Sequence, residues 1–364
     1  MIPFFDYRPQ YARLRSGIDD AIQRVLDSGQ LILGSEVDAF ESEFASFVGV
    51  GGAVGVNSGT DALIVALRAL GIGAGDEVIT VANAGTPVVA AIRATGAMPR
   101  FVDVDPVSLQ LAPERLGDAL SERTRCVIPV HLYGQPAPIE TIAAFAEQHE
   151  LALVEDCAQA HGARVGGRHV GTFGRVGCFS FYPTKNLGAF GDGGICISDD
   201  PELLERLRLE RMYGYRGDRS SQIEGINTRL DEIQAAILRV KLSRLDGALD
   251  ERRRLARRYL DGLATTSLTL PAPPPTVEHA FHLFVVRHDE RDRVGEQLSR
   301  CRIGWAVHYP QPVHRMPAYR FLAYDEGRLP VTEQASRSVL SLPLYPGLED
   351  QAVDRVIEAL TSLA

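Results

Sequence analysis

The sequence has little that would place the protein in or across a membrane. No apolar run approaches the roughly 18 residues that a transmembrane helix requires. The first residues, MIPFFDYRPQY, lack the basic stretch followed by an apolar segment that marks a secretory signal peptide. The five cysteines are odd in number and form no CxxC pair. We therefore expect buried free thiols in a cytoplasmic protein rather than a disulfide framework.

The sequence also lacks an excess of positive charge. Its 364 residues include 38 Lys and Arg against 47 Asp and Glu, a formal net charge of −9. Proteins dedicated to nucleic acids or anionic membranes carry a basic surface, so this balance argues against both partners. It does not argue against a phosphorylated small molecule, because such a ligand needs only a local cradle of donors. We expect no metal cofactor.

Short apolar segments alternate with helical patterns through the first two thirds of the chain. Ser35 is an expected N-cap for one of the helices, which carries several phenylalanines. The expected strands are 53–56, 77–81, 100–104, 125–131, 151–154, 178–182 and 194–198. This alternation predicts an α/β fold with a mixed, mostly parallel sheet flanked by helices. Ligands of such sheets gather at the carboxyl ends of the strands.

The pattern changes after about residue 230. A long charged helix is expected over 230–263, followed by an extended proline-rich linker at 271–275. Further strands are expected over 281–287 and 304–307. We therefore expect two domains: a large one over 1–240, whose N-terminal helix could pack on the small domain, and a smaller α+β one over 241–364.

The first candidate for chemistry is Ser58-Gly59-Thr60, at an expected strand-to-helix junction. The free N–H groups of a helix N-terminus and two hydroxyls can bind an anion, and Gly59 lets a phosphate approach closely. Taken alone, a simple N-cap with Asp61 complementing the helix dipole is the stronger interpretation.

Asp156 and Lys185 are the other two candidates. Asp156 follows an apolar strand, and a partly buried carboxylate needs a cationic or hydrogen-bonding partner. Lys185 lies in a glycine-rich turn, where low-dielectric walls can make a lysine an amine nucleophile. Singly, the alternatives are an N-cap and a solvated loop lysine. Together with the phosphate cradle they match pyridoxal phosphate (PLP), whose phosphate, pyridine nitrogen and aldehyde need these three groups.

Motifs in a fixed order run through nearly the whole chain. They are Ile32–Gly34 with Phe40-Glu41, Asn57–Leu63, Gly75–Ile79, Val154–Asp156 with Gln159, Ser180–Lys185, Asn227–Ala236, His308–Pro310 and Leu340–Pro346. In this order they resemble the aspartate-aminotransferase-fold enzymes of the DegT/DnrJ/EryC1/StrS group, which transaminate keto-sugars, mostly nucleotide-linked. The resemblance implies a PLP-dependent transferase of fold type I.

The resemblance implies a role for each central residue. Lys185 would be the catalytic residue, carrying the cofactor and moving the proton. Asp156 would pair with the pyridine nitrogen and Gln159 with the phenolic oxygen. Because Lys185 is a lysine, the dehydratase reaction of members that carry histidine there is disfavoured.

The resemblance also implies how the phosphate is held. Gly59, Thr60 and Ser180 would bind it from within the subunit. Asn227 would reach it from the neighbouring subunit, which makes a homodimer part of the active site.

The substrate side is less well specified. His308 and Tyr309 would line the sugar pocket. Many members place an aromatic residue over the pyridine face, whereas this chain has Gly85 at about that position. The ring could be covered by Asn83 or by another element, so no stacking residue is assigned.

The implied reaction transfers an amino group from an amino acid, L-glutamate by resemblance, to a keto-sugar in amino-sugar biosynthesis. Segment 213–225 is most like members that act at C3 of a dTDP-linked 6-deoxy-keto-hexose. A 4-keto nucleotide sugar or a keto-cyclitol remains an alternative acceptor, and a non-catalytic regulatory member of the fold is an alternative of another class. Candidates for a nucleotide's pyrophosphate, equally explained as solvated charges, are Arg216, Arg219 and Arg229.

Overall fold

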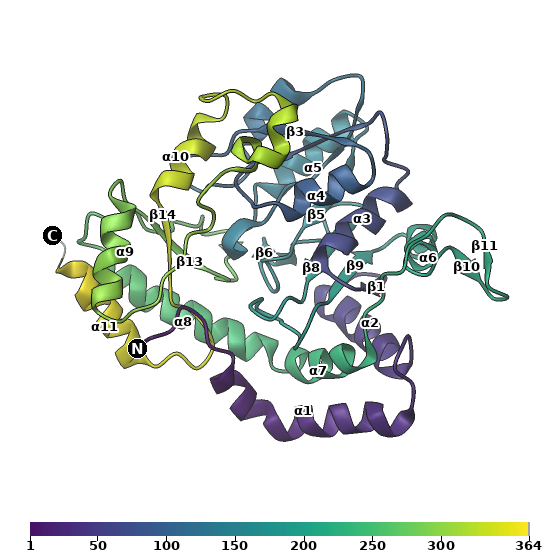
Figure 1. Ribbon diagram of the computed structural model, residues 1–364, viewed down its shortest axis with the longest axis horizontal. Helices are drawn as coiled ribbons and strands as arrows, with labels where there is room; N and C mark the ends of the chain where they lie inside the picture. The colour runs from purple at the N-terminus through teal and green to yellow at the C-terminus, as the bar shows by residue number, and fades with distance from the viewer. Residues whose placement is uncertain (363–364) are drawn as a thin grey trace.

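A seven-stranded sheet forms the centre of the protein, in a computed structural model that describes residues 1–362 (Figure 1). The strand order is β1-β9-β8-β5-β4-β2-β3. The strands are β1 (Gly52–Val56), β2 (Glu77–Val81), β3 (Met98–Val102), β4 (Thr124–Val127), β5 (Ala152–Asp156), β8 (Val176–Ser180) and β9 (Gly194–Ser198). Strand β9 runs antiparallel to its neighbours β1 and β8, and the remaining neighbouring pairs of this sheet are parallel. The predicted mixed, mostly parallel sheet is confirmed.

Helices cover the sheet, which is why its strands are mostly apolar and mostly buried. Every residue of β2 and β9 is buried, as expected for strands packed on both faces. The covering elements are α2 (Ser35–Val48), α3 (Gly59–Ala69), α4 (Pro87–Ala94), α5 (Ile139–Gln148), α6 (Pro201–Glu210), η1 (Pro113–Ala119) and η2 (Leu132–Gly134). Helix α3 packs on β8 and β9. Its first residue, Gly59, lies beside Ser180 at the carboxyl end of β8, the end at which ligands of such sheets gather.

The long helix expected over 230–263 is two helices, so that prediction was wrong. Helix α7 (Glu232–Leu242) and helix α8 (Leu245–Leu263) are separated at Arg244, whose φ of −121° and ψ of 6° are not helical. The break lets the two helices pack on different partners. Helix α7 lies against α2 and α1 (Arg8–Ser28), whereas α8 packs on α11 (Asp350–Thr361). In Figure 1, α1 runs along the lower edge of the molecule beneath α7.

A second apolar cluster is built from the C-terminal part of the chain. It joins α8, α9 (Arg291–Arg300) and α11 to the antiparallel pair β13 (Phe284–Arg287) and β14 (Val339–Leu342). Ile2, ahead of α1, joins this cluster and pairs with Ile303. The expected strand 304–307 is absent, and only Ala306 forms an isolated bridge, with Ser341. A domain division near residue 240 stays a prediction.

Smaller elements complete the described part of the chain. They are β6 (Arg164–Val165), β7 (Arg168–His169), β10 (Tyr215–Arg216), β11 (Ser220–Ser221), β12 (Val277–Glu278), α10 (Pro330–Ser338), η3 (Val313–Arg315) and η4 (Pro317–Leu322). Strands β10 and β11 form a hairpin that projects from the body on the right of Figure 1. Within residues 1–362, no helix combines the length and the apolar character needed to cross a bilayer.

The N-terminus of α2 is capped by a distant carboxylate rather than by Ser35. Ser35 is the first helical residue, and Gly34 occupies the cap position without a side chain. Glu232, at the start of α7, accepts hydrogen bonds from the amides of Gly34 at 2.7 Å, Val37 at 2.9 Å and Glu36 at 3.0 Å. The expected serine cap is thus wrong, because a buried glutamate from another helix satisfies the amides that a serine would cap.

Replacing Glu232 with alanine should destabilise the fold, because three amides at the start of α2 lose their acceptor. We expect a loss of about 2–3 kcal/mol in the free energy of unfolding. Urea denaturation measures it, with Glu140→Ala as the control, since Glu140 is an exposed first-turn glutamate of α5. Equal stability of the two variants would show that Glu232 does not cap α2.

Candidate active site

The chemically distinctive residues meet at the carboxyl ends of the central strands. Asp156 ends β5 and Ser180 ends β8, and the two strands pair in parallel. Gly59 begins α3 so close to Ser180 that a Cβ atom on it would lie 2.5 Å from Ser180 Cβ. Lys185 follows β8 in a turn, and its charge acts on Asp156. The fold therefore gathers four of the predicted site residues at one edge of the sheet.

The turn that carries Lys185 is fixed by contacts from other parts of the chain. Asn186 donates a hydrogen bond to the Ala280 carbonyl at 2.9 Å. Lys241, on α7, donates to the Gly188 carbonyl. The segment that directly follows Lys185 is thereby tied to two separate elements, which restricts where the lysine side chain can reach.

Lys185 is half-buried and Asp156 is buried, and the two side chains have opposite charges. Burial lowers the pKa of Lys185 to about 8, although the Asp156 carboxylate opposes this shift. Burial raises the pKa of Asp156, while a 3.0 Å hydrogen bond from the Ala158 amide and the Lys185 charge oppose that shift. Each group thus stabilises the charged form of the other, and the lysine remains easy to deprotonate.

The side-chain amide of Gln159 has a defined orientation. Its Oε1 accepts a 2.7 Å hydrogen bond from the Tyr133 backbone amide, so the carbonyl end of the side chain is occupied. Its Nε2 therefore faces the other way and donates to the Tyr309 hydroxyl at 3.2 Å. Gln159 can consequently offer a hydrogen-bond donor to an oxygen atom in the site.

His308 and Tyr309 come from the C-terminal part of the chain and close the site. Tyr133 donates its hydroxyl proton to the His308 carbonyl, and His308 Nδ1 lies 2.8 Å from Ser341 Oγ. Burial lowers the pKa of His308 to about 4, with the Lys185 charge acting in the same direction. The ring of Tyr309 packs on Gly85, where a Cβ atom would lie 3.1 Å from Cζ of the tyrosine. The glycine thus leaves room for Tyr309.

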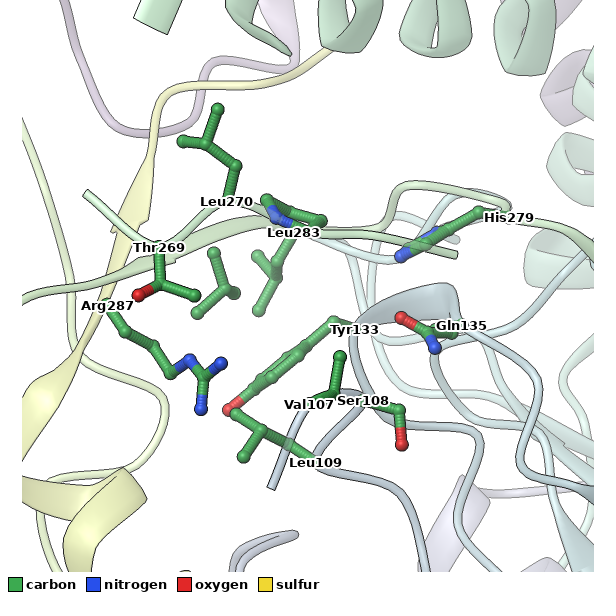
Figure 2. Close-up of a pocket in the computed structure, with 12 residues that line it drawn as sticks. Val107, Ser108, Leu109, Tyr133, Gln135, Thr269, Leu270, His279, Leu283 and Arg287 are labelled. Atoms are coloured by element: carbon green, nitrogen blue, oxygen red, sulfur yellow. The ribbon is translucent and has the colours of Figure 1, made fainter. Parts of the chain in front are cut away.

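Tyr133 separates this site from a small cavity behind it. Figure 2 shows its side chain pointing between Arg287 and Leu109, with the Arg287 guanidinium beside the phenol. Residue 133 has a φ of 63°, which non-glycine residues adopt rarely, so its backbone is held in place by its surroundings.

The start of α3 is compatible with both an N-cap and an anion site at Ser58-Gly59-Thr60. Its Oγ caps the helix by accepting a 3.1 Å bond from the Asp61 amide. The amides of Gly59 and Thr60 belong to the first turn, where the helix itself offers no acceptor, so they can still bind an anion. Thr228 reaches across to donate to Asp61 Oδ2 at 2.8 Å, which ties the helix start to the segment that contains Asn227.

Asn227 is set apart from the other predicted site residues. Its side chain is exposed, and its backbone pairs with Met212 near the base of the β10–β11 hairpin. Arg216 and Arg219 lie on the exposed hairpin, and Arg229 is half-buried beside Met212. No hydrogen bond described here joins Asn227 to the cradle at Gly59.

Sequence reasoning did not identify Tyr133, Asn186 or Lys241 as parts of the site. Tyr133 and Lys241 act through partners far along the chain: Tyr133 on His308 and Lys241 on Gly188. The one local signal is Gly134 after an apolar segment, which indicates a turn at Tyr133-Gly134 but not the partners of Tyr133.

A match to a family model identifies the protein family of this chain. The model of the DegT/DnrJ/EryC1/StrS aminotransferase family matches residues 13–361. The chain belongs to this family. It is therefore an aminotransferase, and its resemblance to the family is confirmed.

Individual members of the family are similar over their whole length. The dTDP-3-amino-3,4,6-trideoxy-α-D-glucose transaminase of Streptomyces venezuelae is 48% identical over 364 residues, covering 100% of this chain and 96% of that protein. A UDP-N-acetyl-3-dehydro-α-D-glucosamine 3-aminotransferase of Acidithiobacillus ferrooxidans is 42% identical, covering 98% and 96%. The crystal structure of Streptomyces venezuelae DesV superposes with a TM-score of 0.98 at 48% identity, covering 100% and 98%.

The aminotransferases of this family depend on PLP, and the residues of this chain fit that cofactor. The missing side chain of Gly59 lets α3 begin directly against Ser180, so the first-turn amides of the helix and the Ser180 hydroxyl lie close enough together to bind one phosphate. Lys185 supplies an amine with a lowered pKa, and Asp156 supplies a buried carboxylate for a protonated ring nitrogen.

The lowered pKa of Lys185 predicts when its amine becomes reactive. Only the neutral amine is a nucleophile, so reductive methylation of Lys185 in the cofactor-free enzyme should rise with pH, with a midpoint near the pKa of about 8. Mass spectrometry of the peptide carrying Lys185 follows the reaction.

Asp156→Asn provides the matched variant. Its neutral side chain no longer stabilises the ammonium form, so the midpoint should move to lower pH. A midpoint at the ordinary lysine value in the wild-type enzyme would contradict the buried setting of the amine.

Proposed function

We propose that this aminotransferase moves an amino group from an amino acid, L-glutamate, to C3 of a nucleotide-linked keto-sugar, a dTDP-linked 3-keto-6-deoxyhexose, in amino-sugar biosynthesis. The observation that carries the proposal is the full-length similarity to the Streptomyces venezuelae transaminase, whose name specifies a dTDP-linked 3-amino sugar. The Acidithiobacillus relative is likewise named for amination at position 3, but of a UDP-linked sugar. Position 3 is thus better supported than the nucleotide carrier.

Each residue near the sheet edge has a cofactor atom that suits it. Lys185 would form the covalent link and Asp156 would hold the protonated pyridine nitrogen. The Nε2 of Gln159 points away from Tyr133 and is a donor, which suits the phenolic oxygen. The phosphate contacts would come from Gly59, Thr60 and Ser180, with the helix dipole of α3 adding to them.

The chain's own residues account for the proton transfers. The bound cofactor supplies an electron sink for the carbanion formed at the donor's α-carbon. The free amine of Lys185 would take the proton from the donor's α-carbon as a base and deliver it as an acid to the cofactor's carbon. Its pKa of about 8 lies close to neutral pH, so it can act in both directions. Asp156 keeps the ring nitrogen charged, and His308 and Tyr309 would position the sugar.

A homodimer would complete the site. Asn227 is exposed and pairs with Met212 just ahead of the β10–β11 hairpin, which suits a residue that reaches the phosphate of the neighbouring subunit. Tyr182 and Phe190 are large exposed aromatic residues that flank the Lys185 turn, and contact with a second copy would cover them. The active site would then sit between the subunits.

The cysteines suit a cytoplasmic setting. All five are free, and those at positions 126, 157, 178 and 196 are buried. We therefore infer that the enzyme works in the reducing cytoplasm, where such thiols persist.

The phosphate cradle predicts the effect of one added methyl group. Gly59→Ala would place its Cβ 2.5 Å from Ser180 Cβ, so the cradle must widen. We expect the dissociation constant for PLP to rise about tenfold or more, as followed by the absorption of the bound cofactor. Gly117→Ala is the control, because nothing lies within 4 Å of a Cβ atom there. Equal PLP affinity of both variants would rule out a phosphate at Gly59.

The substrate assignment is tested one half-reaction at a time. Glutamate should bleach the visible band of the lysine-bound cofactor, and Lys185→Ala should lack both the band and the response. The aminated enzyme is then offered dTDP-3-keto-, dTDP-4-keto- and UDP-4-keto-sugars and a keto-inositol, together with a UDP-3-keto-sugar. Recovery of the band with the dTDP-3-keto-sugar supports the proposal. If the band recovers only with another acceptor, that acceptor takes the place of the dTDP-3-keto-sugar as the assigned substrate. If neither glutamate nor another amino acid changes the band, a non-catalytic member of the family is favoured.

A further inference from the structure

Glu155 is a fully buried carboxylate that the reaction does not use. It directly precedes Asp156 in β5, so the two side chains point to opposite faces of the sheet. Its Oε1 accepts hydrogen bonds from the amides of Phe173 at 2.7 Å and Gly174 at 2.8 Å. Its Oε2 accepts from the Gly171 amide at 2.7 Å and lies 3.1 Å from His131 Nε2. Four donors therefore converge on one buried anion.

The position of the proton on His131 follows from its partners. Nδ1 accepts a 3.0 Å hydrogen bond from the Ala137 amide, so it carries no proton. The proton is then on Nε2, which donates it to Glu155. Both ring nitrogens are occupied, and the imidazole is fixed in one tautomer and one orientation.

This cluster is not a metal site. His131, Glu155 and Cys157 offer ligand atoms within 4.8 Å of one another. The oxygens of Glu155, however, are already engaged by the four donors. Burial also raises the pKa of Cys157 well above its ordinary value, so that residue is a neutral thiol rather than a thiolate ligand.

His131 is joined to the proposed cofactor contacts through its own backbone segment. The His131 amide donates to the Asp156 carbonyl at 3.0 Å. Two residues further on, the Tyr133 amide binds Gln159 Oε1 at 2.7 Å, and the Tyr133 hydroxyl binds the His308 carbonyl. Segment 131–137 thus touches three residues of the site. The bond from His131 to Glu155 is its contact with a buried charge, and backbone and side-chain bonds to Gln110, Ala280 and Leu283 hold the rest of it.

We propose that Glu155, acting through His131, is a positioning residue of this aminotransferase. Its charge fixes the His131 end of segment 131–137, and this segment contacts the Gln159 amide and the Asp156 carbonyl. Glu155 touches neither substrate nor cofactor. The proposal does not depend on which sugar is the acceptor, because the residues it positions face the cofactor.

The requirement for a carboxylate, and not merely a polar group, follows from the four converging donors. In Glu155→Gln one of the two oxygens becomes an NH2 group, which would face backbone N–H groups or the His131 Nε2–H. His131 cannot relieve the conflict by changing its tautomer, because its Nδ1 would then face the Ala137 N–H. A buried donor is left without an acceptor, and segment 131–137 must shift.

Two substitutions at His131 separate the two ends of its ring. His131→Gln can keep a donor near the Nε2 position and so retain the bond to Glu155, but it loses the acceptor for Ala137. His131→Asn can keep an acceptor near Nδ1 for Ala137, but it cannot reach Glu155. Tyr259→Phe serves as the control for general loss of stability, because it removes a buried hydrogen bond to Pro343 in the second apolar cluster.

The experiment measures the holoenzyme of each variant with PLP alone. Visible circular dichroism reports the orientation of the bound cofactor, and the rate of PLP release on dilution reports how firmly it is held. Thermal unfolding is recorded in parallel. We expect Glu155→Gln and His131→Asn to lose much of the visible dichroic signal and to release PLP about tenfold faster. His131→Gln should stay closer to the wild type, and Tyr259→Phe should change only the unfolding temperature.

The opposite results would overturn the proposal. They are a lower unfolding temperature in Glu155→Gln with an unchanged dichroic signal and release rate, or a larger effect in His131→Gln than in His131→Asn. If Glu155→Gln does not fold, the two His131 variants decide the question alone. Because no keto-sugar is added, a failed acceptor assignment leaves these readouts unaffected.

Discussion

The mutual burial of an amine and a carboxylate is the constraint on which the rest of this structure depends. For the proposed reaction Lys185 has to lose its proton readily, and burial favours this because it destabilises the ammonium form. Asp156 must stay charged in the same surroundings, which requires a cation and hydrogen-bond donors. The Lys185 charge and the Ala158 amide meet the second requirement, whereas burial meets the first. The charge of each group offsets part of the cost of burying the charge of the other.

The sheet and its connections bring Lys185 and Asp156 close together. Parallel β5 and β8 end at the same edge, so Asp156 and the turn after Ser180 are brought close by backbone pairing alone. Glycine at position 59 lets α3 begin directly against Ser180. The C-terminal part of the chain then returns to close the site with His308 and Tyr309. The charged and hydroxyl groups of the candidate site therefore come from strand ends, and residues from distant segments pack around them.

Much of this arrangement could be predicted from the sequence, since it depends on local patterns. Alternating apolar strands and helices indicated the mixed sheet, and strand ends indicated where Asp156 would lie. The errors have a common physical cause. Glu232 replaces the expected Ser35 cap from nearly two hundred residues away. The break at Arg244 occurs without glycine or proline, because α7 and α8 pack on different partners.

The supporting residues of the site escaped prediction for a similar reason. Nothing local in the sequence marks Tyr133 as a partner of both Gln159 and His308, or pairs His131 with Glu155 across 24 positions. Such residues are recognised only when the fold has brought their partners together. They contact Gln159, Asp156 and His308, three of the residues that the sequence predicts for the site.

The most direct test of the account is chemical capture of the cofactor on its lysine. Holoenzyme is reduced with borohydride, digested, and examined by mass spectrometry for a phosphopyridoxyl group. We expect one modified peptide, with the group on Lys185. Modification of another lysine, such as the buried Lys241, or the absence of any modified peptide from a cofactor-loaded enzyme, would contradict it.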